Sequence, residues 1–439
     1  MPGSTADVLA FRGEILDFVG DPATLGDIAH RHFADGVLLV RGGKVAAVGP
    51  APAMLASIPA DAVVTDYRGK LILSGFIDTH VHYAQTDIIA SYGAQLLEWL
   101  EKYTFPAEAR FADPKHARDV ADFFVAELLR NGTTTAMVFA TTHKASVDAI
   151  FEAARARSMR VIAGKVLMDR NVPEAVRDTA DSGFDDSQAL IAQWHGRERL
   201  AYAVTPRFAP TSTERQLDLC GRLLEEHPDV FLQSHVAENV GEVAWVADIY
   251  PWSRSYLDVY DHFGLLRERA VYAHCIHLDA TDRKRMADTG TAMSFCATSN
   301  LFLGSGLFDL RAAHECGVRV GLGTDVGGGT TLSMLRTMEE SYKVCQLAGQ
   351  SLSPMQAFYL ATLGGAAALY LEDRIGNFDV GKEADFVVLD PEATPLLARR
   401  MERTTTLAER LFAFMIMGDD RAVHATHVLG ALAHARAGA

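Results

Sequence analysis

The chain has 439 residues, of which 49% are apolar and 22% are charged, a composition typical of a globular enzyme. Its 41 basic and 56 acidic side chains give a formal charge of −15. That charge disfavours nucleic acids and anionic membrane surfaces as partners and leaves small neutral or cationic substrates. At roughly 150 residues per domain the length suggests about three domains, although an α/β barrel uses about 250 or more residues as one unit.

Cysteine usage and the chain start indicate the compartment. The five cysteines are widely spaced, and no Cys-x-x-Cys occurs. A disulfide framework or a cysteine-based zinc site is therefore not expected, and a reducing compartment is the simpler interpretation. Residues 1–7 lack the features of a signal peptide, and the apolar stretch 411–417 is much shorter than the ~20 residues of a membrane helix. We expect a cytoplasmic protein.

Strand-like segments occur at both ends of the chain. Residues 36–40 and 44–49, separated by Arg41-Gly42-Gly43, predict a hairpin with a glycine turn. Residues 385–390 and 422–429 also predict strands. Neither end is large enough to form a good domain alone. We therefore expect residues 1–70 and 376–439 to form one small composite β-sandwich domain.

Short apolar runs alternate with helical segments in the middle of the chain. Continuous apolar runs are expected of parallel strands buried on both faces, and eight occur, at 71–77, 133–139, 160–166, 200–204, 230–233, 270–273, 291–295 and 318–323. Helical periodicity marks intervening segments such as 115–130, 213–226 and 333–347. These units predict an α/β fold with a (β/α)₈ TIM-type barrel over residues 71–375. A doubly wound sheet stays open, because periodicity cannot show whether the sheet closes.

Polar side chains follow four of these runs. In a barrel the active site lies at the carboxyl ends of the strands, and the residues there are His80, His82, His235, His274 and Asp325. His80 and His82 are two residues apart, so an extended strand directs both to one face. Such a pair is weak evidence alone, since His30 and His32 have the same spacing outside the runs. The position after predicted strands favours a metal site formed by His80, His82, His235 and Asp325.

These residue types favour hydrolysis. A metal at this site lowers the pKa of a bound water towards ~7, and Asp325 is placed to accept its proton. Glu238, three residues after His235, is a candidate proton shuttle, and His274 a candidate for orienting the hydroxide or polarising the attacked centre. The alternative for Glu238 is a first-turn glutamate that complements a helix dipole.

The chain resembles the amidohydrolase superfamily. Residues 73–82 (LSGFIDTHVH) look like its opening signature, and residues 376–390 (GNFDVGKEADFVVLD) like its closing one. His235-x-x-Glu238 resembles the deaminase branch, which uses one metal and a glutamate proton shuttle. Within that branch the closest likeness is to the guanine deaminases, through residues 96–108 (LLEWLEKYTFPAE), 205–208 (TPRF), 233–239 (QSHVAEN) and 321–329 (GLGTDVGGG).

The resemblance, which spans essentially the whole chain, implies a cytoplasmic homodimeric zinc enzyme of purine catabolism that converts guanine and water to xanthine and ammonia. It implies one Zn²⁺ per chain, with Fe²⁺ as the less favoured metal. Glu238, Asp325 and His274 would be the catalytic residues. Arg207 would face the guanine carbonyl and Gln85 another polar edge of the base. The full set implied to bind substrate is His82, Gln85, Arg207, Phe208, His235, Glu238 and Asp325.

Several features leave alternatives open. The superfamily often has His-Cys-Pro where this chain has Phe295-Cys296-Ala297, which reshapes the pocket wall. Lys165 follows the third run, where some relatives have a metal-bridging lysine, but a paired lysine is the better interpretation. His143 lines the rim or is structural. Related enzymes act on other aminopurines, 8-oxoguanine or triazines, and an inactive amidohydrolase-like scaffold is the hypothesis from another class.

Overall fold

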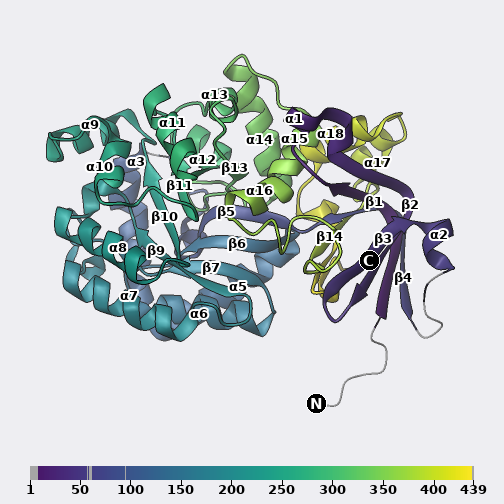
Figure 1. Cartoon of the computed structure of the whole chain (residues 1–439), viewed down its shortest axis with the longest axis horizontal. Coiled ribbons are helices and arrows are strands. Elements are labelled where there is room, and N and C mark those ends of the chain that lie inside the picture. The colour runs from purple at the N-terminus through teal and green to yellow at the C-terminus, as the bar shows by residue number, and fades with distance from the viewer. Residues whose placement is uncertain (1–7, 57, 59–61, 94, 438–439) are drawn as a thin grey trace.

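Eight parallel strands form a barrel in the middle of the chain (Figure 1). The computed structural model describes residues 8–56, 58, 62–93 and 95–437. Around the barrel the strands run β5 (Phe76–His82), β6 (Thr133–Phe139), β7 (Arg160–Gly164), β9 (Leu200–Pro206), β10 (Phe231–Val236), β11 (Ala270–His274), β12 (Ala292–Phe295) and β13 (Val320–Leu322), and β8 (Val166–Leu167) pairs with β9.

The first and last strands of this order meet. The Asp325 amide donates to the His80 carbonyl (2.9 Å), and the His82 amide donates to the Val326 carbonyl (2.9 Å). These bonds join β5 to the segment that follows β13 and bring the sheet round to a barrel. The predicted (β/α)₈ barrel is therefore confirmed, and the doubly wound alternative is wrong.

One predicted run contains two strands. The run 71–77 includes the end of β4 (Val63–Ser74), which belongs to another sheet, and the start of β5. Gly75 separates them, and a Cβ there would lie 2.1 Å from Oγ1 of Thr134. Only glycine fits this close approach. His80 and His82 consequently lie within β5, not after it.

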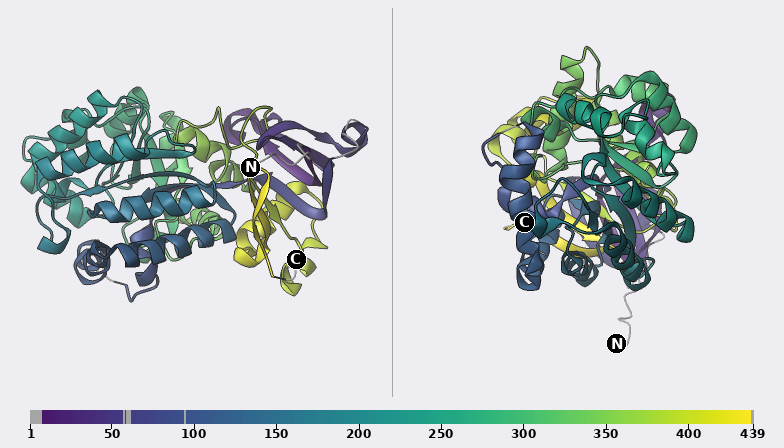
Figure 2. Two further views of the ribbon diagram at one scale, coloured as in Figure 1. Left: turned by 90° about the horizontal axis from the view of Figure 1, so that it is seen from below. Right: turned by 90° about the vertical axis from the view of Figure 1, so that its left-hand side faces the viewer.

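Helices surround the barrel and cover its rim (Figure 2). Those outside the strands include α5 (Pro114–Arg130), α6 (Lys144–Ala156), α7 (Ala180–Trp194), α8 (Glu214–Glu226), α9 (Val240–Ile249), α10 (Tyr256–His262), α11 (Ala280–Thr289), α12 (Ala297–Phe302), α13 (Leu310–Glu315), α14 (Met334–Leu347), α15 (Pro354–Leu360) and α16 (Leu363–Ala368). At the rim a continuous helical segment is formed by α3 (Leu96–Trp99), the π-helix η3 (Leu100–Thr104) and α4 (Phe105–Ala109). Among the described residues, no helix has both the length and the apolarity that crossing a membrane requires.

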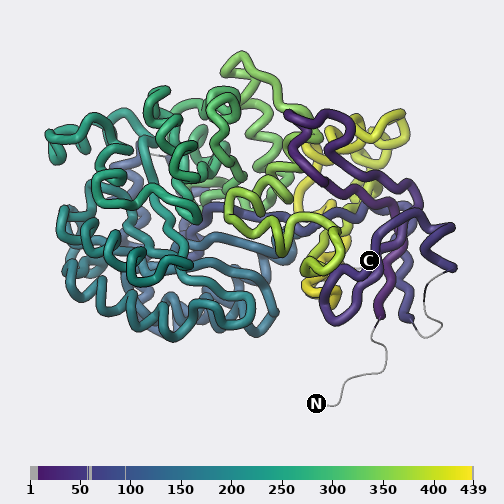
Figure 3. Tube along the Cα trace, viewed as in Figure 1, coloured from purple at the N-terminus to yellow at the C-terminus, as the bar shows by residue number. Residues whose placement is uncertain are grey.

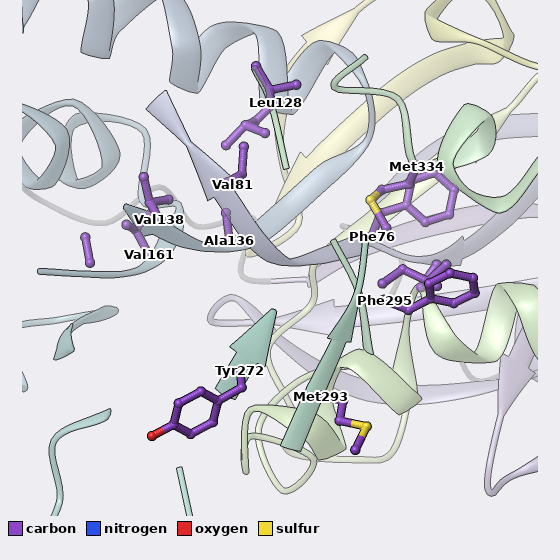
Figure 4. Close-up of a cluster of buried hydrophobic side chains, with 14 of the residues drawn as sticks. Phe76, Val81, Leu128, Ala136, Val138, Val161, Tyr272, Met293, Phe295 and Met334 are labelled. Atoms are coloured by element: carbon purple, nitrogen blue, oxygen red, sulfur yellow. The ribbon is translucent and has the colours of Figure 1, made fainter. Parts of the chain in front are cut away.

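Alternation along the barrel strands divides the core in two. Val138 and Val161 pack outward with the helices, in the cluster drawn in Figure 4. Their neighbours Met137 and Ile162 belong to a second cluster, to which seven barrel strands contribute one residue each, so it fills the barrel interior. Residues of α16 and the segment after it belong to the same cluster. The interior of the barrel opposite the rim is therefore packed with side chains.

The two chain ends form a second, mixed sheet beside the barrel (Figure 3). Its strand order is β16 (Ala431–Ala435), β15 (Val423–Val428), β14 (Phe386–Leu389), β4, β1 (Val8–Phe18), β2 (His30–Arg41) and β3 (Lys44–Pro50). β1 and β4 are parallel, and the other neighbours are antiparallel. The predicted hairpin is confirmed as β2 and β3. The sheet curls, because Val45 of β3 exchanges backbone hydrogen bonds with Gly381 and Lys382 ahead of β14.

A composite sheet built from both ends is thus confirmed. The predicted domain boundaries remain a prediction, and residues 1–7 and 438–439 of that domain lie outside the described residues. The remaining short elements are α1 (Pro22–Leu25), α2 (Ala51–Leu55), α17 (Pro395–Met401), α18 (Leu407–Met417), η1 (Gly26–Ala29), η2 (Tyr83–Ile88), η4 (Arg110–Ala112), η5 (Glu174–Val176), η6 (Ala209–Thr211) and η7 (Asp420–Ala422).

A buried ion-pair cluster joins the two parts. Arg199 of the barrel donates from Nε to Glu383 Oε2 (3.0 Å) and from Nη1 to Asp385 Oδ1 (3.2 Å). Arg160 also donates from Nε to Glu383 Oε2 (3.1 Å). Glu383 and Asp385 are two acidic residues of the closing signature, whose role here is to attach the end sheet to the barrel opposite the active-site rim.

Candidate active site

Two histidines of β5 point at one carboxylate. His80 Nε2 lies 3.2 Å and His82 Nε2 lies 3.3 Å from Oδ1 of Asp325. The two Nε2 atoms are 3.2 Å apart. The spacing of two residues along an extended strand therefore places both imidazoles on the same face, as predicted.

The other imidazole and carboxylate groups that could bind a metal come from the ends of three further strands. His235 lies near the end of β10, His274 ends β11, and Asp325 follows β13. His274 and Asp325 have positive φ angles of 71° and 51°. Left-handed backbone is uncommon outside glycine but is adopted by His and Asp more readily than by most residues. It turns the chain at the rim directly at the side chains that face the site.

The donor set fits a metal ion. His82 Nε2 lies 3.1 Å from His235 Nε2, and His235 Nδ1 lies 2.7 Å from the Arg207 carbonyl, to which only a protonated nitrogen can donate. Burial lowers the pKa of His82 to about 3 and that of His235 well below its usual value, so both rings are neutral. Because the proton of His235 is on Nδ1, the His235 Nε2 that faces His82 carries no proton and has a lone pair available for a metal ion. Two nitrogens bound at ~2.05 Å to one tetrahedral ion are ~3.3 Å apart, close to the observed spacing.

A second combination of ligands shares most of these residues. One ligand atom each of His80, His235, His274 and Asp325 lie within 4.8 Å of one another. This set has His274 in the place that His82 has in the predicted set. His82 fits the fourth position better than His274, because its Nε2 lies within 3.3 Å of Nε2 of His80, Nε2 of His235 and Oδ1 of Asp325. His274 Nε2 is 3.7 Å from Asp325 Oδ2 and is closer to Glu238.

Glu238 lies between His274 and Ser305. Its Oε1 accepts from the Ser305 hydroxyl (2.8 Å), and its Oε2 lies 3.3 Å from His274 Nε2. Burial, and then the nearby Asp325, raise the pKa of Glu238 to about 8. The carboxyl is therefore neutral at pH 7. Since His274 Nδ1 faces the Asn300 side-chain oxygen (2.8 Å) and donates to it, His274 Nε2 is free to accept the Glu238 proton.

Glu238 is not a first-turn helix residue. Asn239 caps α9, which begins at Val240, and the acidic residue in the first turn is Glu242. The helix-dipole alternative for Glu238 is therefore wrong. Asp325 differs electrostatically from Glu238: burial alone would raise its pKa, but the adjacent His80 and His82 outweigh burial and hold the pKa well below its usual range. One acid near the site is thus neutral and the other ionised.

A pocket opens over these groups. Its walls are partly apolar, formed by Leu96, Trp99, Leu100, Phe208 and Leu303. The polar lining includes Gln85, Arg207, Glu238, His274 and Asp325. All seven residues predicted to bind substrate line this one pocket, whereas the fourth predicted metal ligand, His80, lies beneath it.

Comparison with known proteins agrees with this geometry. A model of the amidohydrolase family matches residues 71–433. The chain belongs to the amidohydrolase family. A guanine deaminase of Escherichia coli K12 is 50% identical over 430 residues, which are 97% of this chain and 98% of that protein.

Two solved structures resemble this amidohydrolase over nearly their whole length. The E. coli guanine deaminase structure superposes with a TM-score of 0.95 at 50% identity, covering 97% of this chain and 99% of that one. A guanine deaminase from C. acetobutylicum, solved with guanine bound in the active site, has a TM-score of 0.87 at 28% identity, covering 97% and 99%.

Other histidines and the buried lysine lie away from the metal-type cluster. Lys165 is fully buried and pairs with Asp178, so it is a paired lysine, as we favoured. His143 precedes α6 and does not line the pocket. His277 Nε2 hydrogen-bonds the Ser305 carbonyl (3.0 Å) and so supports the loop that contacts Glu238. His32, with the same spacing motif as His82, instead faces Glu14 in the end sheet (2.7 Å).

Several site residues of this amidohydrolase were not singled out from the sequence. Glu108 binds Arg207 from behind, Ser305 holds Glu238, Asn300 orients His274, and Trp99 forms a pocket wall. Glu108 and Trp99 lie within the motif 96–108, so the resemblance marked their segment without assigning either a role. Asn300 belongs to the Ser-Asn pair that follows Phe295-Cys296-Ala297, a pattern that gave it no role, whereas Ser305 has no local signal, because Glu238 is 67 residues away along the chain.

Proposed function

We propose that this protein hydrolyses guanine to xanthine and ammonia. One observation supports this most directly: a neutral acid, an ionised acid and a metal-type ligand cluster face a single pocket that also contains Arg207 and Gln85. The 50% identity to a guanine deaminase over 97% of the chain supports the same substrate.

We infer that one divalent metal, Zn²⁺ in preference to Fe²⁺, is held by His80, His82, His235 and Asp325. Neutral imidazoles with one carboxylate are ligands typical of zinc. Such an ion supplies Lewis acidity and lets a water act as nucleophile at neutral pH. One nearby carboxyl group assists this arrangement without being a ligand: Asp78 accepts from the Thr324 amide (3.0 Å) and so orients the chain just ahead of Asp325.

The acid residues move the protons. A C–O bond forms at C2 of guanine and the C–NH₂ bond breaks, while water supplies the oxygen, one proton to the departing ammonia and one to the ring nitrogen. Asp325, held ionised, accepts a proton from the attacking water. Glu238, held neutral, donates to the adjacent ring nitrogen, and His274 stabilises the Glu238 proton in the resting state. Asp325 then passes its proton to the departing amine, and the second proton of the water, left on the C2 hydroxyl, restores the proton of Glu238 as the carbonyl forms.

Substrate recognition falls to Arg207, Gln85 and Phe208. Arg207 is 2% exposed and lines the pocket, where its guanidinium presents donors for the purine carbonyl. Phe208 is an apolar wall beside it. A buried site that hydrogen-bonds a substrate strongly rejects analogues lacking the matching group, because its own polar groups are then left unpaired.

Ammonia release from a panel of bases tests the proposal. We expect guanine to be turned over with a kcat/KM at least a hundredfold above that of 8-oxoguanine, adenine, 2-aminopurine and a chlorotriazine. If one of these other bases is hydrolysed with an equal or higher kcat/KM, that base would replace guanine as the proposed substrate. No release from any base by metal-loaded protein would favour the inactive scaffold.

We extend the proposal to a cytoplasmic homodimer with domains at 1–70 plus 376–439 and at 71–375. All five cysteines, Cys220, Cys275, Cys296, Cys316 and Cys345, are free, which is consistent with a reducing compartment. Sedimentation equilibrium tests the dimer: a mass near the 47.7 kDa of one chain at micromolar concentration would contradict it.

A further inference from the structure

A fully buried carboxylate, Glu108, lies behind the substrate-facing side of the pocket. Arg207 Nη1 donates to both of its oxygens, at 2.8 and 2.9 Å. Gln85 Nε2 donates to Oε1 at 3.4 Å. Glu108 therefore contacts both polar residues proposed to bind the base, yet it does not line the pocket itself.

The helical segment of α3, η3 and α4 at the barrel rim places Glu108 behind the pocket. In α4, Phe105 and Glu108 are three residues apart and so share one face of the helix. Arg207 Cζ lies 5.7 Å from the centre of the Phe105 ring, within the range of a cation–π contact. Glu108 and Phe105 together hold one guanidinium, the first through its charge and the second through its ring.

These contacts leave a defined set of donors facing the ligand. Arg207 has five N–H groups, and among the described residues only Nη1 has a hydrogen-bond partner in a side chain. The Gln85 amide is also oriented, because its Oε1 accepts from the Gly327 amide (3.3 Å) while its Nε2 faces Glu108. The buried positive charge of Arg207 is balanced by Glu108. The pocket thus offers N–H donors without a net charge from this pair.

We propose that Glu108 is the positioning residue that makes the pocket selective for purines with a carbonyl at C6, an inference that rests on the proposed function. The donors of Arg207 and Gln85 match a carbonyl oxygen. An amino group at C6 would place its own N–H donors against those of Arg207 and Gln85. A hydrogen at C6 would leave the buried guanidinium without an acceptor. Because Glu108 balances the charge of Arg207, the pocket suits an uncharged base.

The substitution Glu108→Gln tests this with little change of volume. Glutamine removes the counter-charge of Arg207 and turns an N–H₂ group towards the donors of Arg207 or Gln85. Charge-assisted hydrogen bonds contribute ~1.5–3 kcal/mol, which corresponds to about a 10- to 150-fold rise in KM for guanine. We expect kcat and metal content to change much less. Glu101→Gln, an exposed glutamate of the same helical segment, is the matched control and should behave as wild type.

Competitive inhibition by non-reactive bases provides a second readout, which reports on binding at C6 without reaction of the inhibitor. Hypoxanthine has the C6 carbonyl but no 2-amino group, and purine lacks both. We expect wild-type protein to bind hypoxanthine better than purine in competitive inhibition, and this preference to fall at least tenfold in Glu108→Gln. A loss of folded protein would instead lower the apparent kcat and leave KM and the inhibition ratio unchanged.

A double-mutant cycle shows whether Glu108 acts through Arg207. If it does, the KM of the double variant Glu108→Gln/Arg207→Gln equals that of Arg207→Gln within about twofold. Fully additive effects, or a Glu108→Gln variant with wild-type KM and inhibition ratio, overturn the inference. Should Glu108→Gln fail to fold, Glu108→Asp keeps the charge but not the reach, and an unchanged ratio there overturns it equally. If wild-type protein releases no ammonia from guanine, the proposed function fails, and the ratio of the dissociation constants of hypoxanthine and purine, measured by calorimetry on both proteins, still tests Glu108.

Discussion

Glu238→Gln is the substitution that best separates proton transfer from structure. Glutamine has the same shape, and its side-chain oxygen can accept the Ser305 hydroxyl that Glu238 Oε1 accepts at 2.8 Å. Its amide nitrogen can donate to His274 Nε2, 3.3 Å from Glu238 Oε2, as the protonated carboxyl does. Because burial raises the pKa of Glu238 to about 8, the native group is already neutral at pH 7. The resting hydrogen bonds and charge are therefore preserved.

Only the transferable proton is lost. Removal of a general acid lowers the rate by ~10²–10⁴-fold, which is about 3 to 5 kcal/mol in activation free energy. We expect this loss in kcat at pH 7, with metal content and thermal midpoint near those of wild type. Steady-state ammonia release and elemental analysis on the same preparation measure both quantities. A fully metal-loaded Glu238→Gln protein with kcat within tenfold of wild type would refute the proton-transfer role.

Three further predictions concern the metal ligands, the end sheet and the joint between the two parts. His82→Ala should lower bound metal at least ~10-fold by elemental analysis, whereas His32→Ala, with the same sequence spacing, should not. Burial lowers the pKa of His427 from 6.5 to about 4, so the unfolded chain takes up a proton that the folded one refuses. The free energy of unfolding should then carry no penalty from His427 above pH 6.5 and should fall by up to about 3 kcal/mol as the pH drops to 4. Urea unfolding should show a smaller fall for His427→Gln than for wild type. Equal falls in the two proteins would contradict this prediction. Arg199→Met leaves the buried Glu383 and Asp385 partly uncompensated and should cost about 3–5 kcal/mol in the same assay, while Arg215→Met, in an exposed ion pair, should have little effect.

Local signals in the sequence were sufficient for much of the barrel. The apolar run 133–139 coincides with β6. The helices expected at 213–226 and 333–347 differ from α8 and α14 by one residue each, because Thr213 and Ser333 are the N-caps, whose side chains accept from the first turn. Each of these features depends on neighbours a few residues away, which is the range over which periodicity and capping act.

Boundaries set by tertiary contacts were not visible. The run 71–77 is uniformly apolar because β4 and β5 are both buried, and periodicity cannot show that the two strands belong to different sheets. The change of direction at Gly75 depends on the approach of Thr134, a residue of β6. β1, which pairs with both β2 and β4, was also missed. Its alternation is broken by the irregularity near Gly13, where the pairing register shifts.

The same distinction explains which site residues could be predicted. His80, His82, His235, His274 and Asp325 were predicted because a general rule places strand ends together at the rim of a barrel. Glu108 follows no strand. It contacts Arg207 across 99 residues of sequence, and its orientation depends on the π-helix at Leu100–Thr104. A π-helical turn changes the angle between successive residues, so a 3.6-residue period cannot predict the face on which Glu108 lies. Chemistry at strand ends can therefore be inferred from spacing, whereas the orientation of the groups that select the substrate requires the coordinates of the helix that covers them.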